Sequence, residues 1–275
     1  VLQQVENFNN PGITANDAFK PVTRYFDRIT RPEQIIQSFP AAVQTMLDPA
    51  DCGPACIALS QDIQGQTFDY PEDFFKEKIH AIRRPRPDEF QIKEAAEKIK
   101  ASKKPILISG GGVFYSDAME ELSKFAIKHN IPVTQTVMGY STMKRDHSHY
   151  AGQIGALGGK NTNSLARQTD LAIAVGTKLA DFTTGSWTNF ENENFKLVSI
   201  NVSRFDANKH LAQAVVGDAK VSLDELSQAL GEWKASEEWN KKSQIELKAW
   251  NEQVDKESAP SNQKIPSYAQ VIGAV

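Results

Sequence analysis

The chain has 275 residues, of which 40% are hydrophobic and 24% are charged, and its formal net charge at pH 7 is −3. This composition is typical of a globular protein with one large or two medium domains. The charge provides no basic footprint for nucleic acid or an anionic membrane surface, and no apolar run approaches the roughly 20 residues that span a bilayer. We therefore expect a cytoplasmic protein that binds neither nucleic acid nor membranes.

The N-terminal region begins with a stretch that is rich in Asn, Gly and Pro and lacks hydrophobic periodicity, so a loop is expected over residues 1–20. The spacing of Thr30 and Glu33 is that of a capping box and predicts the start of a helix. Apolar residues continue the helical pattern to Leu47. Pro40 lies inside this pattern and is expected either to kink the helix or to end it.

A short apolar run follows at residues 55–59 and predicts a buried strand, in which Cys56 serves as a small core residue. Residues 61–87 are mostly polar and contain several prolines. Such a stretch favours a connection between domains.

From residue 88 onward, helical periodicity alternates with short apolar runs. The expected helices cover 88–101, 116–130, 161–168 and a stretch that Asp218 caps at its N-terminus. The expected strands cover 105–109, 132–137, 171–175, 195–202 and, more weakly, 214–216. Alternating strands and helices need crossover connections. The sequence therefore predicts an α/β fold with a doubly wound parallel sheet, Rossmann-like and covered by helices on both faces.

The remaining segments are expected to be loops and linkers. Residues 139–159 and 177–194 are Gly-rich or polar and are interpreted as loops. Residues 232–256 have the pattern of an exposed, charged helix, which is anchored by large apolar side chains: Trp233, Trp239, Ile245, Leu247 and Trp250. A second linker then leads into another structural element.

A glycine run follows the expected strand at 105–109, which is the place of a dinucleotide-binding loop. Gly110, Gly111 and Gly112 supply part of that fingerprint, but its third glycine position holds Tyr115. A later strand end carries Asn201 where an acidic ribose ligand is typical. A tight turn with close packing is therefore the favoured interpretation, and nucleotide binding at the three glycines is the alternative.

Candidate metal ligands are sparse. Alternate residues of an extended segment project the same way, so His147 and His149 could share an ion, but no further Cys or His nearby completes the set. A solvated loop is the favoured interpretation. Neither a nucleophile elbow nor a Walker loop is present. We predict no metal site and no catalytic residue from the residues alone.

The order of these signals resembles that of the thiamine-diphosphate enzymes. The segments that carry the resemblance are 52–64, 104–113, 131–136, the glycines Gly152, Gly155 and Gly158, 170–179 and 268–272. The resemblance implies four parts: the C-terminal part of a pyrimidine-binding domain with its linker (1–82), a central α/β domain (83–231), a helical linker (232–266) and the start of a pyrophosphate-binding domain (267–275).

Three segments, 1–6, 16–29 and 205–210, are most similar to the inositol-catabolism branch of that family, the trihydroxycyclohexanedione hydrolases. The resemblance implies hydrolytic cleavage of a C–C bond in a cyclic 1,2-diketone, with thiamine diphosphate and Mg²⁺ as cofactors and a homodimer or homotetramer as the assembly. Two alternatives remain open. One is an acetolactate-synthase-like carboligase with a structural FAD, and the other is a nucleotide-binding module without catalytic activity.

The chain begins without Met and ends within an apolar helical pattern, so we expect a piece of a longer enzyme. The family's activating glutamate would lie before residue 1 and its magnesium motif after residue 275, and the piece alone is expected to be inactive and free of cofactor. The resemblance also places Phe19, Lys20 and Arg24 at the edge of the substrate pocket. The alternative, which we favour, is that Phe19 lies in the core and the two cations are solvated.

Overall fold

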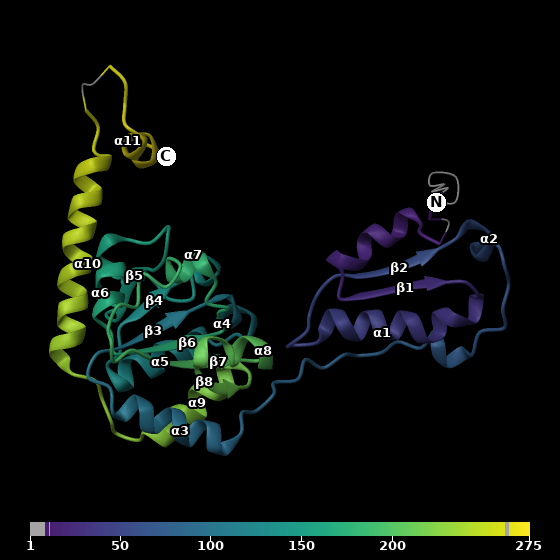
Figure 1. The fold of residues 1–275 in the computed structure, drawn as a ribbon, viewed down its shortest axis with the longest axis horizontal. Coiled ribbons are helices and arrows are strands. Elements are labelled where there is room, and N and C mark those ends of the chain that lie inside the picture. Colours follow the sequence, from purple (N-terminus) through teal and green to yellow (C-terminus); the bar gives the residue numbers. More distant parts are fainter. Residues whose placement is uncertain (1–8, 11, 262–263) are drawn as a thin grey trace. The chain divides into compact units, whose positions relative to one another are not determined.

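The structure is a computed structural model and describes residues 9–10, 12–261 and 264–275. The chain divides into two compact units, Val1–Arg83 and Arg84–Val275 (Figure 1). The expectation for residues 1–6 lies outside the described residues. Each unit is considered by itself below.

The first unit is built on two parallel strands joined by a helix that packs against both. Its elements in chain order are η1 (Ala15–Val22), β1 (Tyr25–Ile29), η2 (Pro32–Gln34), α1 (Ile35–Leu47), β2 (Ala55–Leu59), α2 (Gln61–Gln64) and η3 (Glu72–Phe74). The strand expected at residues 55–59 is confirmed, but the expected burial is wrong for Cys56, which is half-buried, and for Leu59, which is 42% exposed. Strand β1 was not expected, because Asp27 and Arg28 interrupt its apolar pattern.

Two further expectations for this unit are wrong. Part of the expected N-terminal loop is the helical turn η1, which Thr14 and Asp17 begin with a reciprocal capping box. The capping box expected for Thr30 and Glu33 is replaced by a different contact, in which the backbone N–H of Thr30 donates to the Gln34 side chain at 3.1 Å. The helical region begins with η2 at Pro32 and continues as α1 from Ile35. Pro40 lies inside α1 and does not end it.

The second unit contains a six-stranded parallel sheet in the order β5-β4-β3-β6-β7-β8. Its elements are α3 (Glu89–Lys100), β3 (Pro105–Ser109), α4 (Gly111–Tyr115), α5 (Met119–His129), β4 (Val133–Gln135), η4 (Val137–Gly139), β5 (Tyr150–Gln153), α6 (Lys160–Gln168), β6 (Leu171–Val175), α7 (Asp181–Thr184), β7 (Lys196–Asn201), α8 (Arg204–Ala207), η5 (Lys209–Leu211), β8 (Gln213–Val216), α9 (Ala219–Leu230), α10 (Glu237–Ser258) and α11 (Tyr268–Gly273). The predicted α/β fold with a parallel sheet is confirmed.

Side chains of each strand alternate between two apolar layers, one on each face of the sheet. Leu107 and its counterparts on the other strands pack with α3, α5 and α9. Ile106 and Ile108 pack with α6 and α10 on the opposite face. Every residue of β3 and β6 is buried, which is why these strands read as continuous apolar runs in the sequence.

The Gly-rich stretch expected to be a loop contains the edge strand β5. Gly152 within it has a φ of +104°, and its pairing with β4 shifts register between Val133 and Thr134. Glycine and irregular pairing leave no period-2 pattern, so the sequence did not reveal this strand. The short helices α4 and α7 were likewise not expected.

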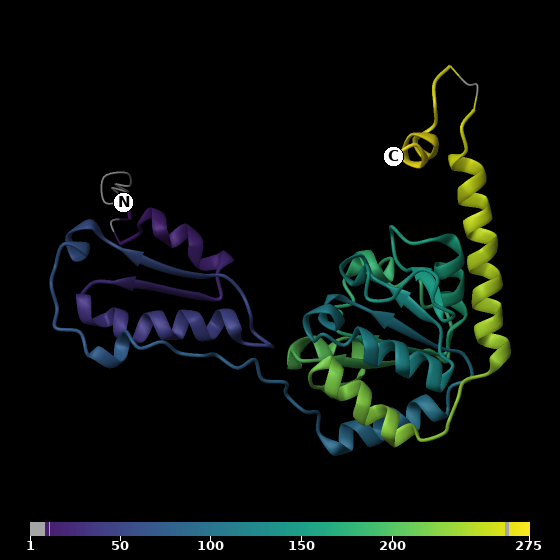
Figure 2. The ribbon, with the colours of Figure 1, turned by 180° about the vertical axis from the view of Figure 1, so that it is seen from behind.

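Helix α10 lies alongside β5 and α6, as both views of the fold show (Figure 1, Figure 2). The Gln244 side chain donates to the carbonyl of Tyr150 in the edge strand, at 2.9 Å. The indole of Trp239 donates to the carbonyl of Pro105, also at 2.9 Å. Trp239 and Leu247 are buried as expected, whereas Ile245 is 69% exposed and does not anchor the helix. The helix thus covers the edge of the sheet that is otherwise open to strand addition.

Asp218 caps α9, as predicted, and also holds the segment that leads into the second unit. Its carboxylate accepts hydrogen bonds from the backbone N–H of Lys220 and lies 3.1 Å from the Arg84 guanidinium. Its own N–H donates to the carbonyl of Pro85, at 2.8 Å. One buried carboxylate therefore joins a helix cap to an ion pair.

We expect the substitutions Asp218→Ala and Asp218→Asn to separate these two roles. Asn keeps the cap and should lower the free energy of unfolding by about 1 kcal/mol, whereas Ala loses cap and ion pair and should cost about 2 kcal/mol. Asp88→Ala removes the exposed cap of α3, whose carboxylate accepts the backbone N–H of Phe90 at 2.9 Å, and serves as the cap-only control. Urea unfolding measures all three. Equal losses in the Ala and Asn variants would contradict a contribution from the cap.

Candidate functional site

The carboxyl edge of the six-stranded sheet is the first place to look for a ligand site. The chain passes from β3 through β4 to β5, and then returns to the other side of β3 to form β6. Ligands of open α/β sheets usually bind where the strand order reverses in this way. The loops that meet there follow β3 and β6, and they contain Gly110 to Gly112 and Gly176.

These two loops pack directly against each other. The N–H of Gly110 donates to the carbonyl of Val175 at 2.9 Å, and the N–H of Gly112 donates to the carbonyl of Gly176 at 2.8 Å. A Cβ atom on Gly110 would lie 2.4 Å from the carbonyl oxygen of Gly176. Close packing therefore accounts for the glycines. A nucleotide contact by Gly110, Gly111 and Gly112 stays a prediction.

The asparagine at the end of β7 is also engaged within the fold. The side-chain amide of Asn201 donates to the carbonyl of Thr177 at 3.2 Å and accepts from the N–H of Ser203 at 2.9 Å. Asn201 is buried. It thus fastens the loop after β6 to the loop after β7.

The Gly-rich loop after β5 is also held by hydrogen bonds to other parts of the second unit. Gly155 has a φ of +105°, and both its N–H and its carbonyl are bound by the side chain of Asn163, at 3.0 and 2.9 Å. The next N–H, of Ala156, donates to the carbonyl of Phe182 at 2.7 Å. The sequence analysis did not identify Asn163, because the glycine it binds lies eight residues away in a loop of irregular backbone.

Large apolar side chains are exposed along the same edge. They follow the carboxyl ends of five neighbouring strands, where α4, α7 and α8 also lie (Figure 1). The set comprises Phe114, Tyr115, Val137, Met138, Tyr140, Leu157, Phe182 and Phe205, each at least 46% exposed. Such a concentration is typical of a surface that another protein segment or a ligand covers. The arrangement provides apolar contact, whereas acid–base or nucleophilic chemistry would need convergent titratable groups.

Within the described residues, no group of three or more His, Cys, Asp or Glu side chains could hold a metal ion. The rings of His147 and His149 each have a hydrogen-bond partner within the fold. His147 Nε2 lies 2.9 Å from the Ser123 hydroxyl, and His149 Nε2 lies 3.1 Å from the Asn130 side-chain oxygen. The expectation of a solvated loop is wrong for His149, which is 8% exposed.

In the first unit, the structure gives Phe19, Lys20 and Arg24 different surroundings. Phe19 is 51% exposed and is not a core residue. The Lys20 ammonium lies 2.8 Å from the Asp17 carboxylate, and this hydrogen bond lowers the pKa of Asp17 to about 2. Arg24 lines a separate hollow together with Asp48. A role of these three residues at a substrate pocket stays a prediction.

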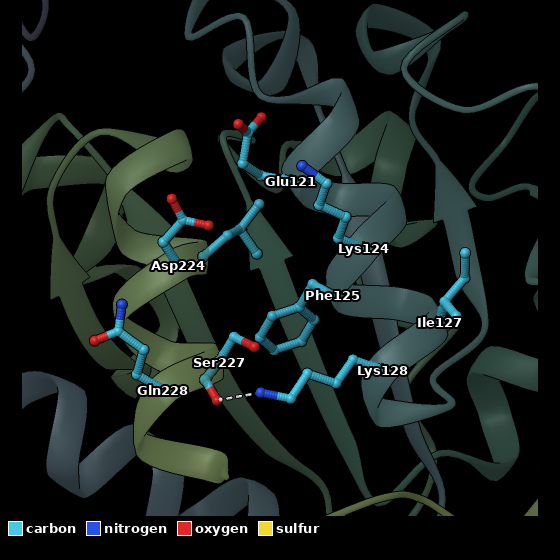
Figure 3. Close-up of a pocket in the computed structure, with 9 residues that line it drawn as sticks. Glu121, Lys124, Phe125, Ile127, Lys128, Asp224, Ser227 and Gln228 are labelled. Carbon is cyan, nitrogen blue, oxygen red and sulfur yellow. Dashed lines mark hydrogen bonds between the residues drawn. The ribbon is translucent and has the colours of Figure 1, made fainter. Parts of the chain in front are cut away.

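A groove of about 490 Å³ lies between α5 and α9 (Figure 3). Phe125 and Leu223, both buried, belong to its apolar lining. Lys124 and Lys128 line it from α5. The Lys128 ammonium reaches across to the carbonyl of Ser227 on α9, at 3.4 Å. The groove is a seam between two helices of the scaffold, and its lining comes from α5 and α9, not from the loops that follow β3 and β6.

No helix of the described residues has both the length and the apolar character that a bilayer requires.

Residues 92–226 match the family described as thiamine pyrophosphate enzyme, central domain.

Several relatives are named 3D-(3,5/4)-trihydroxycyclohexane-1,2-dione hydrolase. The protein of Clostridium perfringens (strain 13 / Type A) is 44% identical over 254 residues, which cover 92% of this chain and 40% of that protein. The protein of Bacillus licheniformis is 46% identical over 235 residues (86% of this chain, 37% of that protein), and that of Bacillus subtilis (strain 168) is 47% identical over 226 residues (82% and 36%). The chain thus spans about two fifths of the length of the relatives it matches. Residues 92–226 of this chain are therefore a central domain of the thiamine pyrophosphate enzyme family.

Proposed function

We propose that this chain is part of a thiamine-diphosphate-dependent hydrolase of myo-inositol catabolism, which opens the ring of a cyclic 1,2-diketone by cleaving a C–C bond. The observation that carries the proposal is the identity of 44% over 254 residues to a protein with that name. The aligned length exceeds that of the unit Arg84–Val275, so the match includes part of the first unit as well. An alignment that extends through both units supports the same kind of enzyme more strongly than an alignment of the central domain alone.

The described residues do not themselves fit the metal-bound cofactor. Mg²⁺ needs several oxygen ligands in octahedral geometry, usually carboxylates together with the cofactor's phosphates. No cluster of acidic side chains among the described residues provides them. We therefore assign no step of cofactor chemistry to this chain. Its part in the proposed enzyme is to supply the central scaffold, with the apolar carboxyl edge as a contact surface.

A chimera tests the proposed function. The aligned segment of the Bacillus subtilis relative is replaced by this chain, and ring opening of the cyclic diketone is assayed with thiamine diphosphate and Mg²⁺. We expect the chimera to retain hydrolase activity, because the grafted segment comes from the same kind of enzyme. The matched control carries the central domain of an acetolactate-synthase-like carboligase. A folded chimera that forms acetolactate, or that purifies with a flavin absorption band, would favour the carboligase alternative.

The chain alone is expected to show no detectable binding of thiamine diphosphate in the presence of Mg²⁺. The physical reason is that the metal supplies most of the electrostatic attraction for the diphosphate, and the described residues lack its ligands. Isothermal titration calorimetry measures this directly. Micromolar affinity would show that the chain contains a complete diphosphate site and would contradict the proposed division of roles.

A further inference from the structure

The segment that leads from α9 into α10 is fastened to the carboxyl end of α5 by a buried histidine. His129 is 0% exposed. Its Nδ1 lies 2.8 Å from the carbonyl of Trp233, and its Nε2 lies 2.9 Å from the hydroxyl of Ser227 on α9. Its own carbonyl accepts a hydrogen bond from the N–H of Ala235, at 2.9 Å. Three hydrogen bonds of His129 thus connect α5, α9 and the segment 233–235 that precedes α10.

The next residue extends these contacts to a second segment. Asn130 ends α5 in the left-handed conformation, with a φ of 54°. Its side-chain nitrogen donates to the carbonyl of Ala235 at 3.2 Å, and its side-chain oxygen faces His149 Nε2 at 3.1 Å. His149 comes from the irregular segment 144–149. Asn130 therefore lies between the two segments and binds both.

His147 holds the same irregular segment at a second point on α5. Its Nε2 bonds to the hydroxyl of Ser123, and its Nδ1 accepts the backbone N–H of His149 at 3.1 Å. An Nδ1 that accepts a hydrogen bond must be unprotonated, so this arrangement requires the neutral ring. Protonation would place a second N–H opposite the N–H of His149 and break the contact.

Few surrounding charges compensate a proton on these rings. His129 is faced by the positive charges of Lys128 from α5 and Lys234 from the segment before α10, and by the negative charge of Glu232, while the Trp233 carbonyl favours the protonated ring but does not outweigh burial. From α9 it is faced by the neutral Ser227. The charged or titratable neighbour of His147 is Asp146, and that of His149 is His147 itself.

Burial lowers the pKa of all three histidines from the ordinary value of 6.5. A lowered pKa means that the bound segments favour neutral rings, whereas released segments take up protons. Their attachment is therefore complete above about pH 6.5 and weakens as the pH falls below it. Ser227 also lines the open groove of Figure 3.

We propose that His129, His147 and His149 form a clasp that fastens residues 144–149 and 233–235 to α5 at neutral pH and releases both segments on mild acidification. The released part comprises the segment that precedes α10 and the segment that precedes the edge strand β5. The pairing of β3 with β6 and of β6 with β7 is kept, because none of the three histidines belongs to these strands. The clasp is independent of the proposed hydrolase activity and is tested on the chain itself.

Amide hydrogen exchange at pH 7.5 and 5.5, corrected for the intrinsic rate, tests the clasp at individual residues. The reporters are three backbone N–H groups. Those of Ala235 and Tyr150 donate to the backbone carbonyls of His129 and His147, respectively, and that of His149 donates to Nδ1 of the His147 ring. We expect their protection to fall about tenfold per pH unit for each proton taken up below pH 6.5. The N–H groups of β6 and β7 should keep their protection.

His129→Gln removes the titratable ring but can still donate to the Trp233 carbonyl, so it should reduce the pH dependence at Ala235. His80→Gln, in the exposed polar stretch of the first unit, is the matched control and should change nothing. If His129→Gln does not fold, the imidazole resonances of the unaltered chain decide by their midpoints of titration. Equal protection at both pH values, uniform loss across the sheet, or titration of all three rings at their ordinary value would overturn the clasp.

Discussion

Replacing Trp239 by alanine is expected to lower the free energy of unfolding of the second unit by about 3–5 kcal/mol. The indole is 4% exposed and packs in the apolar layer between the sheet and α10. Its removal leaves a cavity and also leaves the carbonyl of Pro105 without the indole N–H that lies 2.9 Å away. Urea unfolding followed by far-UV circular dichroism measures the loss without relying on tryptophan fluorescence.

Two further variants separate the contributions at this position. Trp239→Phe retains most of the apolar contact and loses the hydrogen bond, so it should cost roughly 1–3 kcal/mol. Ile245→Ala alters an exposed side chain on the same helix and should stay within about 0.5 kcal/mol of the parent. A Trp239→Ala loss no larger than that of Ile245→Ala would show that the burial of Trp239 contributes nothing to the stability of the second unit.

Gly155→Ala is expected to destabilise the second unit by about 3 kcal/mol or more. A φ of +105° is strained for any L-residue, and the added Cβ would lie 2.1 Å from the carbonyl oxygen of Phe182. The backbone at Phe182 also binds the N–H of Ala156, so it cannot move away without losing that bond. The same unfolding experiment measures the effect.

Gly231→Ala is the matched control for Gly155→Ala. Gly231 also has a positive φ, of +62°, but nothing lies within 4 Å of an added Cβ. Its substitution reports backbone strain alone and should cost about 1–3 kcal/mol. Similar losses in the two variants would mean that the loop after β5 yields to the clash, and that Gly155 is needed only for its dihedral angle.

The sequence predicted the elements whose burial is complete. Strands β3 and β6 have every side chain buried, so an apolar run between breakers identified them. Strand β1 was missed because Asp27 and Arg28 lie within it. The Asp27 carboxylate is bound by Gln34 of the following helical turn, at 3.1 Å. A polar residue that is satisfied by a distant side chain looks like a loop residue until the partner is known.

The candidate site was also only partly predictable, because its contacts join residues that lie far apart in the sequence. The glycines after β3 were recognised, but their purpose depends on Gly176, which follows another strand. The ion pair of Arg84 with Asp218 joins residues 134 positions apart, and no local pattern indicates it. The three histidines of the clasp come from α5 and from the segment before β5. Only the fold brings them together, whereas the sequence analysis favoured a solvated loop for His147 and His149.

Helix α10 also fixes the distance between its two ends and the rotation of one end relative to the other. Its 22 residues correspond to a rod of about 33 Å. The buried side chains lie in its first half, from Trp239 to Leu247, while the far end meets α11 through the bond of Gln270 to Ala259, at 3.2 Å. One residue inserted between Leu247 and Ser258 would turn the far end by about 100° and advance it by about 1.5 Å. The number of residues in the exposed half therefore sets the direction that the chain takes beyond the helix, so insertions there should be tolerated best in steps close to whole turns.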